Sequence, residues 1–182
     1  MKYYQRLITS GRTVFGVADL AKILEIEDDN YLRVLTTRMG KRGELRRLAT
    51  GIYTCFNEYS VNELANKLKV PSYVSLETVL FREGVIFQDY SKIVTSVANN
   101  TVRKMVDGVN YWYYKVKDEI LSNPAGVENG RATVERAACD VIYLSPKFYF
   151  DRPEILDRER MMSLSEIYNL RVEKEVEKLC LR

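Results

Sequence analysis

The sequence predicts an α+β protein in two parts, residues 1–57 and residues 58–182. The first part alternates helical apolar spacing with good capping residues and ends in a basic, β-rich hairpin. The second part reads as helices, then strands, then helices, an order typical of an α+β domain with a mainly antiparallel sheet. The 182 residues are 46% hydrophobic and 29% charged, which indicates an ordinary globular chain.

Three elements are predicted before the hairpin. Apolar spacing predicts a short helix over residues 3–9, a helix over residues 17–24 with Asp19 in its first turn, and a third over residues 29–42. Asp28 is a good N-cap for the third helix, and Gly43 is placed to end it.

The third helix has two different faces. At 100° per residue, Leu32, Leu35 and Met39 lie within about 60° of one another and are expected to face the core. The opposite face carries side chains that read base edges and hold phosphates. They are Asn30, Arg33, Thr37 and Lys41, flanked by Val34 and Arg38.

A basic hairpin follows directly. Residues 44–48 and 52–56 are β-rich, with a turn at residues 49–51 between them. Six Lys or Arg residues occur between Arg33 and Arg47 against Glu44 alone, a pattern that fits a phosphate-binding surface as well as a merely solvated helix face.

The order of these elements predicts an N-terminal winged helix-turn-helix that binds DNA. One helix comes first, two helices joined by a tight turn follow it, and the basic hairpin comes last. The expected DNA-binding residues are those of the third helix, its end and the hairpin: Asn30, Arg33, Thr37, Arg38, Lys41, Arg42, Arg46, Arg47 and Thr50.

The second part begins with two predicted helices. Ser60 and Glu63 form a capping box for the first, and Ser72 is placed to cap the second, which extends to about residue 83. Later elements are strands over 93–97, 102–106 and 111–116, a hairpin turn at Asn129-Gly130, a helix over 134–144 capped by Thr133, and a helix over 161–182.

Composition excludes several enzyme classes. The chain has no histidine, which removes Ser-His-Asp hydrolases, Cys-His proteases and metal sites that need His ligands. Cys55, Cys139 and Cys180 lie far apart, as expected of a protein from a reducing cytosol.

Polar residues of the helix over 134–144 favour structure over catalysis. Glu135 and Asp140 are about 140° apart on it, so they do not converge as an acid–base pair, whereas Arg136 and Asp140 are placed to pair on one face. Cys139 lies in an apolar pattern, as a buried small side chain would. We expect no catalytic residue, no cofactor and no metal, so the chain is not predicted to be an enzyme.

Membrane association is not predicted either. No stretch approaches the ~20 apolar residues of a membrane helix, and the first residues lack the apolar core of a secretion signal. We therefore expect a cytoplasmic protein.

The order of motifs resembles a known family, the abortive-infection type IV antitoxins, which are AbiEi-like predicted transcriptional regulators of viral defence. The resemblance covers about residues 1–165. It is carried by Leu45-Arg46-Arg47-Leu48-Ala49-Thr50-Gly51-Ile52-Tyr53, Pro71-Ser72-Tyr73-Val74-Ser75-Leu76-Glu77-Thr78-Val79-Leu80, Gly84-Val85-Ile86, Val94-Thr95-Ser96-Val97 and Ala132-Thr133-Val134-Glu135-Arg136-Ala137-Ala138-Cys139-Asp140.

The resemblance implies a transcriptional autorepressor that binds inverted repeats of double-stranded DNA in its own promoter. It also implies an antitoxin domain that counters a nucleotidyltransferase-type toxin without a stable complex. Two alternatives remain at this point: a winged-helix regulator whose C-terminal domain senses a ligand, and a winged helix that binds a protein partner in place of DNA.

Overall fold

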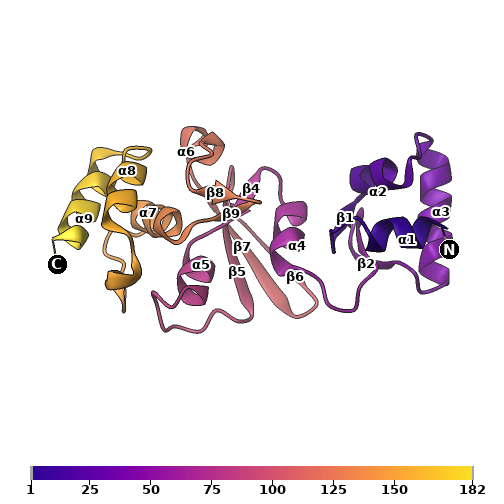
Figure 1. The fold of residues 1–182 in the computed structure, drawn as a ribbon, viewed down its shortest axis with the longest axis horizontal. Coiled ribbons are helices and arrows are strands. Elements are labelled where there is room, and N and C mark those ends of the chain that lie inside the picture. The colour runs from indigo at the N-terminus through magenta and orange to yellow at the C-terminus, as the bar shows by residue number, and fades with distance from the viewer. Residues whose placement is uncertain (1, 182) are drawn as a thin grey trace. The chain divides into compact units, whose positions relative to one another are not determined.

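The computed structural model describes residues 2–181 of a chain that divides into two compact units, residues 1–68 (the first unit) and 69–182 (the second unit). Figure 1 labels their elements. The first unit contains α1 (Lys2–Ile8), β1 (Phe15–Gly16), α2 (Val17–Leu24), α3 (Asp29–Lys41), β2 (Arg46–Ala49), β3 (Ile52–Thr54) and α4 (Val61–Leu68). The second contains β4 (Ser72–Val74), α5 (Glu77–Arg82), β5 (Ile93–Ala98), β6 (Val102–Val106), β7 (Val109–Lys115), α6 (Asp118–Ser122), β8 (Val127–Glu128), β9 (Arg131–Ala132), α7 (Val134–Leu144), the 3-10 helix η1 (Pro153–Ile155), α8 (Arg158–Ser165) and α9 (Leu170–Cys180).

The first unit packs α1, α2 and α3 beside an antiparallel sheet of order β1-β3-β2. The Asp28 side chain accepts hydrogen bonds from the backbone N–H groups of Asn30 and Tyr31, which confirms it as the N-cap of α3. The buried core draws on all three helices, on β1 and on the residue that precedes β2: Leu7, Phe15, Leu20, Leu24, Leu32, Leu35, Met39 and Leu45.

Helix α4 belongs to the first unit because Glu63 joins it to the segment before β1. The Ser60 hydroxyl accepts from the Glu63 N–H as a cap should, at 3.3 Å. The Glu63 carboxylate, however, accepts from the N–H groups of Thr13 and Val14, both at 2.8 Å, and from the Thr13 hydroxyl at 2.9 Å. The observed boundary after residue 68 therefore lies later than the predicted one after residue 57.

The sheet of the second unit is mixed. Its strand order is β6-β7-β5-β4-β9-β8, with β5–β7 and β4–β9 parallel and the other three pairings antiparallel. The predicted hairpin turn at Asn129-Gly130 is present between β8 and β9. The prediction of a mainly antiparallel sheet is confirmed in part: three of the five pairings are antiparallel, but β7, and not the sequence neighbour β6, lies beside β5 and pairs with it in parallel.

The predicted helix capped by Ser72 is also corrected. Residues 72–74 form strand β4, in which Tyr73 and Val74 are buried against β5, and α5 begins only at Glu77. Leu76 separates strand from helix with a φ of 62°, a conformation that L-residues rarely adopt. The Ser72 hydroxyl donates to the Lys69 carbonyl and caps no helix.

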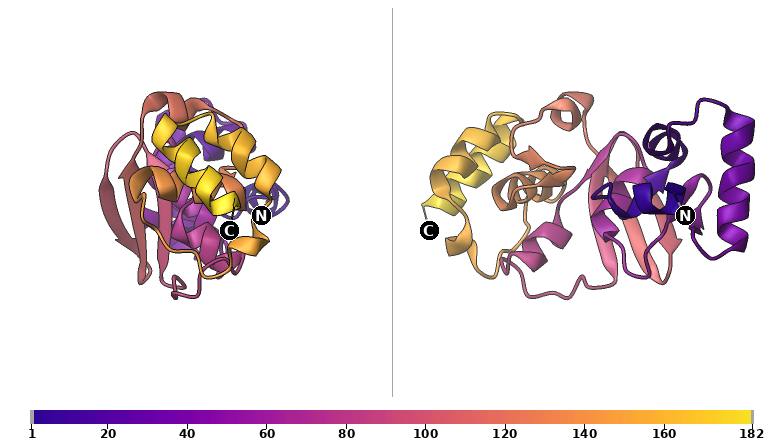
Figure 2. Two further views of the ribbon diagram at one scale, coloured as in Figure 1. Left: turned by 90° about the vertical axis from the view of Figure 1, so that its left-hand side faces the viewer. Right: turned by 45° about the vertical axis from the view of Figure 1, so that its right-hand side comes forward.

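Helix α7 is buried along most of its length, from Glu135 to Ile142. Its neighbours include α5, α8 and α9, and Figures 1 and 2 show α8 and α9 side by side next to it. The single helix predicted over 161–182 is two helices in the described residues, because Asn169 accepts from the Val172 N–H and starts α9 anew. Arg182, the end of that prediction, lies outside the described residues.

Within residues 2–181, no helix is both long enough and apolar enough to cross a membrane.

Candidate nucleic-acid interface

The exposed face of α3 carries polar and basic side chains that the sequence predicts to contact DNA. Leu32, Leu35 and Met39 are buried, as predicted, which turns the polar side of the helix to solvent. All nine predicted DNA-binding residues are exposed: Asn30, Arg33, Thr37, Arg38, Lys41, Arg42, Arg46, Arg47 and Thr50.

The cations of this face differ in how far they are neutralised. Within residues 2–181, Arg33, Arg38 and Lys41 form no ion pair with a carboxylate. Arg42 pairs with Glu44 at 2.8 Å. Arg33, Arg38 and Lys41 can therefore bind an anion without first losing an ion pair. Arg42 would have to break its ion pair with Glu44 or bind the anion beside it.

The Thr37 hydroxyl is already bonded within α3. Its Oγ1 donates to the Arg33 carbonyl at 2.8 Å, and Thr36 donates to the same carbonyl at 3.0 Å. Such bonds to the preceding turn occupy the hydroxyl hydrogen. Thr37 thus offers a ligand its methyl group and its oxygen lone pairs.

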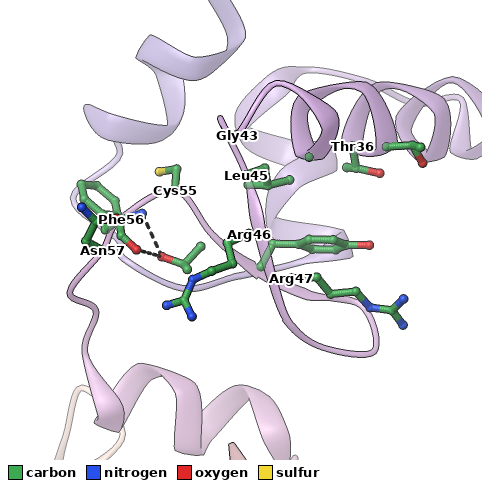
Figure 3. Close-up of a pocket in the computed structure, with 12 residues that line it drawn as sticks. Thr36, Gly43, Leu45, Arg46, Arg47, Cys55, Phe56 and Asn57 are labelled. Atoms are coloured by element: carbon green, nitrogen blue, oxygen red, sulfur yellow. Dashed lines mark hydrogen bonds between the residues drawn. The ribbon is translucent and has the colours of Figure 1, made fainter. Parts of the chain in front are cut away.

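The β2–β3 hairpin turns through Thr50 and Gly51, where a φ of 72° at Gly51 suits a residue without a side chain. Arg46 and Arg47 are successive residues of β2 and extend in different directions (Figure 3). The Arg46 guanidinium lies 5.5 Å from the centroid of the Tyr59 ring. Arg47 Nε donates to the Ala49 carbonyl at 3.2 Å.

A groove of about 620 Å³ separates α3 from the hairpin (Figure 3). Thr36, Thr37 and Gly40 line it from the helix, and Arg46 and Arg47 line it from β2. The groove thus lies where the exposed face of α3 meets the cations of the hairpin.

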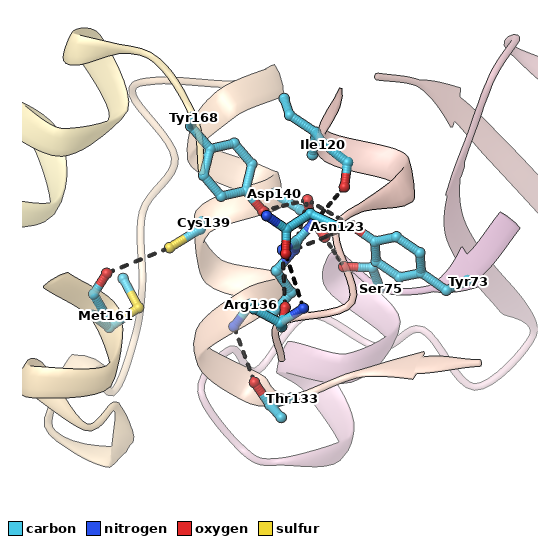
Figure 4. Close-up of polar contacts among 11 residues, drawn as sticks. Tyr73, Ser75, Ile120, Asn123, Thr133, Arg136, Cys139, Asp140, Met161 and Tyr168 are labelled. Atoms are coloured by element: carbon cyan, nitrogen blue, oxygen red, sulfur yellow. Dashed lines mark hydrogen bonds and ion pairs between the residues drawn. The ribbon is translucent and has the colours of Figure 1, made fainter. Parts of the chain in front are cut away.

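The second unit contains a buried polar network around Asp140 (Figure 4). Its carboxylate accepts from the Tyr73 hydroxyl at 3.1 Å, from the Ser75 hydroxyl at 2.6 Å and from the Tyr168 hydroxyl at 2.7 Å. Arg136 Nε lies 3.8 Å from the carboxylate, and both side chains are fully buried. The sequence predicted the Arg136–Asp140 pair on one helix face but did not predict that the pair would be buried or that the three hydroxyls would join it.

The pKa shifts of the buried groups indicate that this network stabilises the fold. Burial and the Asp140 charge raise the pKa of the Tyr73 and Tyr168 hydroxyls, which keeps both protonated as donors. Burial also raises the pKa of the Asp140 carboxyl, although Arg136 and the three hydroxyls favour the ionised form.

Cys139 lies fully buried in α7. Burial raises the pKa of the Cys139 thiol, so it is not the thiolate that a nucleophile requires. In the part of the chain that the structure describes, no three Cys, Asp or Glu side chains are grouped to hold a metal ion.

Comparison with known proteins gives a likeness of fold but no match to a family model. No protein-family model matches the sequence, and no curated protein matches it. The chain is similar in structure to a mycobacterial protein. The crystal structure of the RV2827C protein from Mycobacterium tuberculosis aligns with 99% of this chain and 76% of that one, with a TM-score of 0.50 and 12% identity. At that identity the likeness supports the α+β fold alone.

Proposed function

We propose that the first unit is a winged helix-turn-helix that binds duplex DNA. The order α1-β1-α2-α3-β2-β3 supports this proposal, since two helices joined by a short turn precede a hairpin that shares a sheet with β1. In this assignment α3 is the recognition helix and enters the major groove, while the β2–β3 hairpin is the wing. The observation that carries the proposal is the exposed face of α3, where Arg33, Arg38 and Lys41 have no carboxylate partner within residues 2–181.

The two elements have different tasks on DNA. Asn30, Arg33 and Thr37 lie along the exposed side of α3, where side chains reach base edges. Arg47 and Thr50 lie on the wing, where contacts go to phosphates or to a narrow minor groove. Base contacts supply sequence preference, and phosphate contacts supply affinity that depends on salt.

The regulated site is proposed to be the promoter of the protein's own operon, bound at inverted repeats by a cytoplasmic autorepressor. The resemblance of the wing to that of the AbiEi-like antitoxins supports this assignment. Inverted repeats present two equal half-sites, which two copies of the first unit would occupy.

A gel-shift experiment tests DNA binding. The full-length protein is expected to bind duplex DNA from upstream of its own operon more tightly than random duplex DNA. The affinity should fall steeply with salt, because contacts to phosphates release counterions. Equal affinity for both duplexes at low salt would refute autorepression, and no binding to either would refute the assignment of the first unit.

The second unit is proposed to be an antitoxin domain that counters a nucleotidyltransferase-type toxin without a stable complex. The motifs that carry the family resemblance support this. Residues 71–80 run through β4 into α5, and residues 132–140 run from β9 into α7. Together they supply the Tyr73–Ser75–Arg136–Asp140 network around which the unit is built. No catalytic step by this chain is part of the proposal.

Co-expression tests the antitoxin assignment. If a nucleotidyltransferase gene lies beside this one, growth arrest on its expression should be relieved by the full-length protein. Variants Arg33→Ala and Arg47→Ala, which are expected to lose DNA affinity, should relieve it equally well when expressed from an unrelated promoter. Failure of the unaltered protein to relieve arrest would favour the alternative, a regulator whose second unit senses a ligand. The groove of about 300 Å³ beside Phe148 and Leu179 is where that ligand would be sought.

A further inference from the structure

The exposed face of α3 includes an aliphatic side chain among its polar and basic groups. Val34 is 43% exposed in the middle of the helix, and Tyr31 is 47% exposed one turn before it. Residues three and four apart are neighbours on a helix surface, so Val34 lies beside Tyr31, Thr37 and Arg38. Contacts to phosphates and to polar base edges account for the cations of this face, but they give no reason for an aliphatic group at its centre.

Thr37 extends the apolar surface of Val34. Because the Thr37 hydroxyl donates to the Arg33 carbonyl, its hydrogen is occupied within the helix and its methyl group is the apolar part left for a ligand. Val34 and the Thr37 methyl together form what we call the methyl strip, flanked by Arg33 and Arg38.

We propose that the methyl strip binds the 5-methyl group of thymine in the major groove, so that the protein selects sites with an A·T pair at a fixed position. The inference rests on the proposed function, because it needs α3 to lie in the major groove. Thymine presents a methyl group at that edge, and aliphatic side chains are the groups that contact it. Arg33 contacts a base edge on one side of the strip and Arg38 contacts a phosphate on the other, and both bring the strip to the bases.

Deoxyuridine provides the test, since it keeps the base pairing of thymine and lacks only the methyl group. Preferred duplexes are first selected from a random library with the full-length protein. Each thymine of the best site is then replaced singly by deoxyuridine, and dissociation constants are measured. At one position at least, the replacement should weaken binding about fourfold, the effect of one buried methyl group.

Variants of Val34 and Thr37 test whether the methyl strip causes the loss of affinity on deoxyuridine replacement. In Val34→Ala the same deoxyuridine replacement should change affinity little, because the group that contacted the methyl is gone. Thr37→Ser keeps the hydroxyl and should reduce the penalty in part. Val17→Ala removes the same atoms from a residue that is 46% exposed at the start of α2, and it should keep the full penalty.

The possible outcomes distinguish a failure of the methyl contact from a failure of the proposed DNA binding. A protein that selects no duplex at all contradicts the proposed DNA binding. A protein that selects a duplex without thymine, or one in which no deoxyuridine replacement matters, overturns the methyl contact and leaves DNA binding in place. Equal penalties in the unaltered protein and in Val34→Ala overturn it as well.

Discussion

Asp140→Ala is expected to lower the free energy of unfolding of the second unit by about 3–5 kcal/mol. The variant leaves the Arg136 guanidinium fully buried without its carboxylate, and it deprives the hydroxyls of Tyr73, Ser75 and Tyr168 of their common acceptor. Urea unfolding followed by the fluorescence of Trp112, the single tryptophan, reports on this unit because Trp112 lies in β7.

A double-mutant cycle separates the pair from the rest of the network. Arg136→Met should also destabilise the unit strongly, and the combined variant should lose much less than the sum of the two single losses, because neither charge is then left unpaired. The control Asp118→Ala removes an exposed carboxylate and should change stability by less than about 0.5 kcal/mol. A loss below about 1 kcal/mol in Asp140→Ala would contradict the structural role of the network.

Arg33→Ala is expected to weaken binding to the operator by about 1–3 kcal/mol and to weaken binding to random DNA much less. Arg33 is exposed on α3 and pairs with no carboxylate in the described residues, so its guanidinium is available to a base edge. Binding isotherms on both duplexes at three salt concentrations measure the two effects separately.

Wing variants give the contrasting result. The double variant Arg46→Ala, Arg47→Ala should weaken both duplexes alike and flatten the salt dependence by about one unit for each lost phosphate contact. The two single variants are expected to differ in how much DNA affinity they lose, because the Arg46 guanidinium lies over the Tyr59 ring, whereas Arg47 donates to the Ala49 carbonyl. If Arg33→Ala left the operator preference intact while the wing variant abolished it, the hairpin and not α3 would be the reading element.

Local signals in the sequence predicted most of the first unit. The Asp28 cap, the spacing of Leu32, Leu35 and Met39, and the turn at Gly51 each depend on residues close in the chain, and all are present. The exposure of the five candidates in α3 (Asn30, Arg33, Thr37, Arg38 and Lys41) follows from the same spacing, because a helix that buries one side exposes the other.

The second unit was predicted less well because distant residues decide its structure. The stretch that begins at Ser72 fits a strand or a helix by its own pattern, and pairing with β5 decides for the strand. The burial of Arg136 and Asp140 results from packing against β4 and the α8–α9 region, which adjacent sequence does not reveal. The parallel β5–β7 pairing is likewise a non-local choice.

The hydrogen bonds that Glu63 accepts from Thr13 and Val14 set a lower limit on the size of a portable form of the first unit, for which we propose DNA binding. A fragment that stops at residue 57 would leave two backbone donors beside β1 without their acceptor, and the α4 contact would be lost with it. Recombination that joins the first unit to another partner domain therefore has to cross after residue 68, within the short stretch that leads to β4.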